Sequence, residues 1–220
     1  MKKVILLPLL ILSICTITNQ TLNAQNTKSN TALNKEEQKV MDYIDANMPR
    51  AIALLKESVN INSGTLNIAG VKKVGEIFAR EFEKANFKTK WIPMPDSLRR
   101  AGHLVATTGF NNEAADKKNP KRKKLFLIGH LDTVFEPDMP ANPFTMLNDS
   151  TATGQGVNDM KGGDVVMIIA LQALHAQGLL KDADIIAYLT GDEEHAANPR
   201  EISRADFIES AKKTDIALAF

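Results

Sequence analysis

The sequence predicts an α/β layered domain with a mixed, largely parallel central sheet flanked by helices. Apolar segments of strand length alternate along the chain with segments of helical periodicity, which is typical of such sheets. With 220 residues, the chain is long enough for one sizeable core. Its hydrophobic content of 44% and charged content of 24% are those of an ordinary globular protein.

Two helices are expected before the first strand. Residues 35–59 carry apolar side chains at helical spacing, and the segment Asn62-Ser63-Gly64-Thr65 follows as a break. Residues 69–85 carry a second apolar stripe, because Val74, Phe78 and Phe82 fall on one helix face.

The remaining elements are three strands, a helix, a strand, a second helix and a last strand. Their expected ranges are 87–92, 103–107, 125–129, 162–177, 184–190, 204–213 and 215–220. Residues 111–124 form a charged loop, with six basic residues at positions 117–124. Because the whole chain is close to neutral, a solvated loop tip explains this run better than an anion site.

Residues 1–24 have the layout of a secretory signal peptide. A basic start precedes an apolar run at residues 4–15, and Ala24 offers a small side chain before the cleavage point. We therefore expect a secreted or periplasmic protein whose mature chain begins near Gln25. Residues 25–34 are polar and show no periodicity, so they are expected to form a flexible leader.

A membrane anchor and a lipoprotein are the alternatives for this N-terminus. The apolar run of twelve residues spans only about 18 Å as a helix, well short of the bilayer core. No stable membrane anchor is therefore expected. A lipoprotein modified at Cys15 would need a small residue just before it, where Ile14 stands.

The net charge argues against nucleic acid as a partner. Removal of the signal takes two lysines and no acid, so 27 basic residues fall to 25 against 26 acidic ones, a net charge of −1. A near-neutral protein has no electrostatic reason to bind nucleic acid or anionic lipid. The only cysteine, Cys15, leaves with the signal, so the mature protein is expected to have neither thiol chemistry nor disulfides.

Residues with metal-binding chemistry follow the strand expected at 125–129. His130 and Asp132 are two positions apart, so their side chains can lie on the same side. An imidazole is a common zinc ligand, and a carboxylate beside it can fix its tautomer. Taken alone, however, a histidine at a strand end is more often structural.

Two further groups of acids leave alternatives open. Asp159 precedes a glycine-rich helix start, where it can bridge two cations or cap the helix, and its neighbours alone favour the cap. Asp192, Glu193 and Glu194 follow the strand at 184–190 as three neighbouring acids that repel one another. A solvated loop tolerates such a run, whereas bound cations would relieve it and leave one acid as a general base.

The combination of these groups indicates the function. The chain contains His-x-Asp-Thr-Val, then Asp-x-Lys-Gly-Gly and then Gly-Asp-Glu-Glu, with 27 positions from Asp132 to Asp159 and 34 from Asp159 to Glu193. In order and spacing these motifs resemble the di-zinc peptidase family of carboxypeptidase G, aminoacylase, acetylornithine deacetylase and succinyl-diaminopimelate desuccinylase. The resemblance covers about residues 35–220, and Asn62-Ser63-Gly64-Thr65 also resembles the carboxypeptidase G branch.

The resemblance implies a role for each site residue. His130 would bind one zinc ion, Asp159 would bridge two, and Glu194 would bind the other; cobalt or manganese would suit the same ligands. Asp132 would orient His130, and Glu193 would be the general base that takes a proton from the attacking water. The family also has a cis peptide bond after its bridging aspartate, here Asp159–Met160.

Two departures from the family bear on substrate and completeness. Residues 195–199 replace a glycine-serine loop, which affects the expected substrate preference. The family's next metal carboxylate, its last histidine ligand and its small dimerisation domain would follow Phe220. We therefore expect residues 35–220 to be the N-terminal part of the catalytic domain of a longer, homodimeric enzyme. The chain alone is expected to be inactive, because each zinc would keep two protein ligands instead of three.

The expected reaction is the metal-dependent, carboxypeptidase-like hydrolysis of an amide bond in small peptides or in N-acyl or glutamyl amino acids. One alternative is an N-acyl amino acid deacylase of the same family, which would use the same metals and base. Another is a non-catalytic binding domain with the same fold, and the complete motif set argues against it. The other histidines, His103, His175 and His195, are expected to lie outside the metal site.

Overall fold

The computed structural model describes residues 32–109 and 122–220. Its main sheet has five strands in the order β1-β2-β6-β3-β7, and β4 and β5 form a separate pair. The strands are β1 (Lys88–Ile92), β2 (His103–Thr108), β3 (Lys124–His130), β4 (Thr145–Asn148), β5 (Thr151–Thr153), β6 (Asp184–Thr190) and β7 (Ile216–Ala219).

The main sheet is mixed, as predicted. β3 pairs in parallel with both β6 and β7, whereas β2 runs antiparallel to both β1 and β6. Of the five strands in this described sheet, β2 alone is therefore reversed. β3 and β6 are in register from Lys124 opposite Asp184 to His130 opposite Thr190, so the two strands end at the same edge.

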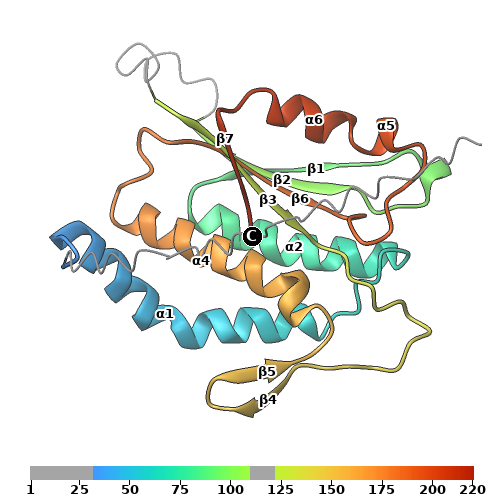
Figure 1. Ribbon diagram of the computed structural model, residues 1–220, viewed down its shortest axis with the longest axis horizontal. Coiled ribbons are helices and arrows are strands. Elements are labelled where there is room, and N and C mark those ends of the chain that lie inside the picture. Colours follow the sequence, from blue (N-terminus) through green and yellow to red (C-terminus); the bar gives the residue numbers. More distant parts are fainter. Residues whose placement is uncertain (1–31, 110–121) are drawn as a thin grey trace, which may run out of the picture. The chain divides into compact units, whose positions relative to one another are not determined.

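Helices cover both faces of this sheet (Figure 1). α1 (Lys35–Val59), α2 (Ile68–Lys84) and α4 (Gly162–Ala176) lie on one face, and the short α5 (Arg200–Ser203) and α6 (Ala205–Ala211) lie on the other. All helices and strands predicted from the sequence are present, each within two residues of its expected bounds. The structure adds the short helix α5, a 3₁₀ turn at Asp96–Leu98 and a π-type turn at Val157–Lys161.

α1 begins at the predicted residue because a capping box formed by Asn34 and Glu37 closes its first turn. The side chain of Asn34 accepts hydrogen bonds from the backbone N–H groups of Glu36 and Glu37, and the Glu37 carboxylate accepts one from the Asn34 N–H. This reciprocal arrangement satisfies donors that the helix itself leaves unpaired.

The central strand β6 is buried along its whole length. Ile185, Ala187 and Leu189 belong to the larger core, beneath α1, α2 and α4. Ile186 and Tyr188 face the other way, into a smaller core that includes Phe207 of α6. Burial on both faces explains why this strand reads as a continuous apolar run in the sequence.

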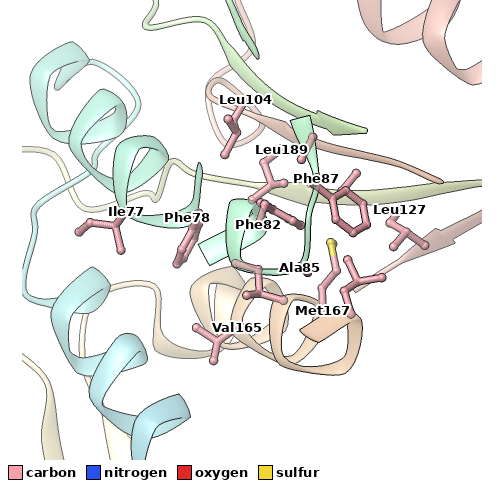
Figure 2. Close-up of a cluster of buried hydrophobic side chains, with 14 of the residues drawn as sticks. Ile77, Phe78, Phe82, Ala85, Phe87, Leu104, Leu127, Val165, Met167 and Leu189 are labelled. Carbon is pink, nitrogen blue, oxygen red and sulfur yellow. The ribbon is translucent and has the colours of Figure 1, made fainter. Parts of the chain in front are cut away.

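Aromatic and aliphatic side chains from helices and strands meet in the larger core. Figure 2 shows Phe78 and Phe82 of α2 together with Met167 of α4 and Leu127 and Leu189 of the sheet. Each such side chain contributes roughly 1.5–3 kcal/mol when it is fully buried. This packing provides a rigid base for the strand ends that carry the polar residues.

The hairpin of β4 and β5 was not predicted. All four residues of β4 are exposed, so the hairpin leaves little of the alternating apolar pattern by which strands are identified. The predicted signal peptide and most of the leader fall outside the described residues, as does most of the loop at 111–124. None of the described helices is long and apolar enough to cross a membrane.

Candidate metal centre

The shared edge of β3 and β6 brings distant motifs together. His130 is the last residue of β3 and lies opposite Thr190, the last residue of β6. The residues that follow each strand therefore meet, and Asp132 lies within hydrogen-bond distance of the Glu193 and Glu194 backbone. Open α/β sheets place their sites at such carboxyl ends.

Three possible metal ligands converge at this edge. One ligand atom each from His130, Asp159 and Glu194 lies within 4.8 Å of the other two. The Nε2 atom of His130 is 2.9 Å from Oδ1 of Asp159. One imidazole and two carboxylates form a donor set that suits zinc or a similar divalent ion, so the residues present fit a metal site.

Glu193 lies beside this cluster, and its side chain is largely exposed to solvent. Its Oε2 atom is 3.9 Å from Nε2 of His130, and its side chain is 58% exposed. The predicted site residues His130, Asp132, Asp159, Glu193 and Glu194 are thus all brought together.

Asp132 is the buried centre of the site. Its Oδ1 atom accepts a hydrogen bond from the backbone N–H of Glu193 (3.0 Å) and lies 3.5 Å from Nδ1 of His130. Its Oδ2 atom accepts from the N–H of Glu194 (3.1 Å) and from the hydroxyl of Thr65 (2.6 Å). Nδ1 of His130 is closer to the backbone carbonyl of Asp132, at 3.0 Å. The carboxylate therefore holds the turn after β6 as well as facing the imidazole.

The electrostatic environment of the metal-free site favours charged forms of His130 and Asp132. Burial alone would lower the pKa of His130, but the carboxylates of Asp132 and Asp164 raise it to about 9. Burial would raise the pKa of Asp132, but hydrogen bonds from His130, Thr65 and the Glu193 N–H hold it below its usual value. Burial and the nearby Asp159 carboxylate raise the pKa of Glu194. A cation in the cluster would relieve this repulsion between Asp159 and Glu194.

A tight turn delivers Asp159 to the cluster. Gly156 has a φ of 70°, and the Asp159–Met160 peptide bond is cis, as the family resemblance implies. Lys161 is fully buried. Its ammonium group donates hydrogen bonds to the carbonyl of Ser58 (3.0 Å), in the last turn of α1, and to that of Ile61 (2.9 Å), just after the helix. Asp159 is therefore not the helix cap that its neighbours alone favour: Lys161 occupies the N-cap position of α4.

Asp164 lies beneath the site and was not singled out from the sequence. It is fully buried, and neither carboxylate oxygen has a hydrogen-bond partner among the described residues. Burial raises its pKa well above the usual range, although His130 and Lys161 oppose the shift. A Cβ atom on Gly129 would lie 2.1 Å from Oδ1 of Asp164, which explains the glycine before His130.

Asp192, the first of the three neighbouring acids, does not join the cluster. It is fully buried, forms an ion pair with Arg204 and accepts a hydrogen bond from the backbone N–H of Ala197 at 2.9 Å. Because Arg204 neutralises Asp192, the repulsion expected among the three acids is left mainly between Glu193 and Glu194.

A cavity of about 620 Å³ opens beside the cluster. Its walls include His130, Asp159 and Glu193, together with Arg200, Arg204 and Phe207 from the segment after β6. Arg204 is paired with Asp192, whereas Arg200 is exposed. The cavity thus combines acidic residues at the candidate metal site with the exposed guanidinium group of Arg200.

The other histidines lie outside the cluster, as predicted. His103 is buried, and its Nδ1 atom accepts from the Gly191 N–H, so Nε2 carries the hydrogen that is donated to the Ser203 carbonyl. His175 lies in the last turn of α4, and His195 is exposed.

Comparison with known proteins agrees with the motif resemblance. Residues 126–219 match the family model of peptidase family M20/M25/M40. Carboxypeptidase G2 of Pseudomonas sp. (strain RS-16) is 29% identical over 174 residues, which are 78% of this chain and 38% of that protein. This chain therefore spans well under half the length of that curated relative.

Two solved structures share the fold. Human carnosine dipeptidase 1 superposes with a TM-score of 0.66 at 19% identity, over 83% of this chain and 40% of that one. The dipeptidase Dug1p of Saccharomyces cerevisiae superposes with a TM-score of 0.64 at 16% identity, with the same coverage of 83% and 40%. At these identities the likeness shows the fold alone, and it confirms the predicted layered α/β class.

Proposed function

We propose that the protein containing this chain hydrolyses amide bonds with a bound metal, because residues 126–219 match the model of peptidase family M20/M25/M40 and carboxypeptidase G2 is similar in sequence. The observation that carries the proposal is the convergence of His130, Asp159 and Glu194 within 4.8 Å, next to the open carboxylate of Glu193. A purely structural cluster would have no need of an exposed acid at the mouth of a cavity.

The metal ligands in this chain are proposed to be His130, Asp159 and Glu194. Zinc fits them best, cobalt and manganese are acceptable, and by the family resemblance a complete site would hold two ions with Asp159 shared. When bound, the metal supplies a Lewis acid that polarises the amide carbonyl.

Glu193 is proposed to act as the general base. Its carboxylate takes a proton from the attacking water and returns it to the leaving amine. Asp132 holds the backbone of Glu193 and faces His130, so it fixes both the base and the imidazole in place.

The cavity supports a small substrate with a free carboxylate. A volume of about 620 Å³ lies in the range of small-molecule sites. Arg200 lines the same cavity as His130, and a guanidinium group can bind a carboxylate through two hydrogen bonds. Small peptides, N-acyl amino acids and glutamyl conjugates all carry such a group, so a carboxypeptidase and an N-acyl amino acid deacylase both remain candidates. A non-catalytic binding domain would not need Glu193.

Hydrolysis is expected to depend on both metal and substrate carboxylate. The test uses dipeptides, N-acyl amino acids and glutamyl conjugates, each as a free acid and as the matched C-terminal amide. Treatment with a chelator should abolish hydrolysis, and zinc should restore it. The free acids should be hydrolysed at least about tenfold more efficiently (in kcat/KM) than the matched amides, which is the contribution expected from one charged hydrogen bond. Undiminished hydrolysis by metal-free protein would contradict the proposal.

Export is a separate proposal that concerns the N-terminus. The basic start, the apolar run at residues 4–15 and Ala24 support a cleaved signal peptide and a secreted or periplasmic protein. N-terminal sequencing of protein from an exporting host should find Gln25 first, whereas a retained Met1 on membrane-bound protein would count against cleavage.

The domain and partner proposals rest on the family resemblance. Residues 35–220 are proposed to form the N-terminal part of the catalytic domain. Because the chain spans 38% of the length of its curated relative, we propose that further metal ligands and a homodimer interface lie in other parts of the protein.

A further inference from the structure

We propose that Thr65 is a positioning residue, which sets the places of Glu193 and Glu194 through the carboxylate of Asp132. Its consequence for metal binding and catalysis rests on the proposed function. The positioning itself rests only on the hydrogen bonds described below.

Thr65 is held rigidly in the loop between α1 and α2. It is 1% exposed, and its backbone N–H donates to the carbonyl of Thr133 at 3.2 Å. The N–H of Thr133 donates in turn to the carbonyl of Ser63 at 2.9 Å. These two bonds hold the loop against the segment after β3, so the backbone that carries the Thr65 hydroxyl is fixed in position.

The hydroxyl of Thr65 reaches the residue that organises the site. It donates to Oδ2 of Asp132 at 2.6 Å, a short bond of the charge-assisted kind. The two oxygens of this carboxylate accept the backbone N–H groups of two successive residues, Glu193 at Oδ1 and Glu194 at Oδ2. The orientation of this carboxylate therefore sets the positions of the Glu193 and Glu194 backbone N–H groups within the turn after β6.

Loss of the hydroxyl would free this carboxylate to rotate. Asp132 is fully buried, so water does not readily replace the lost donor. The side chain of Glu193 is 58% exposed, and its place therefore depends on its backbone more than on packing. A shift of that backbone would move the proposed base and the proposed ligand Glu194 together.

The same loop provides a matched control. Ser63 lies two residues before Thr65 and is also fully buried, but its hydroxyl has no hydrogen-bond partner among the described residues. Replacing Ser63 by alanine removes a buried hydroxyl from the loop without touching Asp132.

The experiment compares Thr65→Val, Thr65→Ala, Thr65→Ser and Ser63→Ala in the protein that contains this chain. The first readout is amide hydrogen exchange of residues 191–197 in metal-free protein, with α2 as the internal reference. Thr65→Val should speed exchange at Glu193 and Glu194 at least about tenfold relative to α2, and zinc affinity should fall about 10–100-fold. Thr65→Ser should restore both values, and Ser63→Ala should match the wild type. Thr65→Ala tests the same loss if the valine variant does not fold.

The outcomes separate positioning from general stability and from the proposed function. Unchanged exchange at Glu193 and Glu194 in the folded valine or alanine variant would overturn the proposal. The same effect in Ser63→Ala would also overturn it, because the loop as a whole would then be responsible. Faster exchange in a protein whose wild type binds no zinc would sustain the positioning role and refute the metal site.

Discussion

Replacing Glu193 by glutamine is expected to lower kcat by about 10²–10⁴ while leaving the metal content unchanged. The amide has nearly the shape of the carboxylate but cannot take a proton. Glu193 lies beside the three clustered ligands without being one of them, since its nearest carboxylate oxygen is 3.9 Å from Nε2 of His130. The measurement is kcat on the best substrate, together with elemental analysis of the purified protein.

Glu194→Gln is the matched control for this change. It makes the same chemical substitution one residue away, but at a member of the ligand cluster. This variant should lose metal affinity first and regain part of its activity at high zinc concentration. Near-normal turnover of Glu193→Gln at full metal loading would refute the assignment of Glu193 as the base.

The layered fold was predictable because its signals are local. α1 and α2 show apolar side chains at helical spacing, and β6 shows the continuous apolar run of a strand buried on both faces. The mixed sheet was predicted as a class. The position of the reversed strand β2 was not, because strand order depends on pairing between distant segments.

The members of the candidate site were also predictable, but the bonds between them were not. The motifs identified His130, Asp159 and Glu194, which the structure brings within 4.8 Å of one another. The bond from Thr65 to Asp132 joins residues 67 positions apart, and no local pattern reports such a contact.

Burial was the other information that the sequence lacked. The motifs gave roles to Glu193 and Glu194 but none to Asp192, which is fully buried and paired with Arg204, twelve positions later. Asp164 was not singled out from the sequence, yet it is fully buried under Gly129. Neither difference is visible until the strands and helices are packed together.

The affinity for zinc is expected to rise steeply with pH, because His130 must lose a proton to bind it. In the metal-free protein the pKa of His130 is about 9, so the imidazole is mostly protonated at neutral pH. Zinc binds only the neutral ring. Each pH unit below that pKa therefore lowers the apparent affinity about tenfold, and the gain ends once the pH exceeds it. Between about pH 6.5 and 8.5, the expected increase is roughly 75-fold, because the slope begins to flatten as the pH approaches the pKa.

Two histidine variants connect this slope to the cluster. His130→Gln should bind zinc weakly and lose the steep pH dependence, because the proton-competing ligand is gone. His195→Gln removes an exposed imidazole from the adjacent loop and should keep both the affinity and the slope.

Calorimetric titration of the metal-free protein with zinc, over this pH range and with these two variants, tests the metal centre most directly. We expect zinc binding by the wild type and by His195→Gln to strengthen about tenfold per pH unit, with about one proton released per ion bound at this site. We expect His130→Gln to show neither effect. Unchanged zinc binding by His130→Gln, with the same pH dependence as the wild type, would show that His130 is not a zinc ligand and would contradict the proposed metal centre.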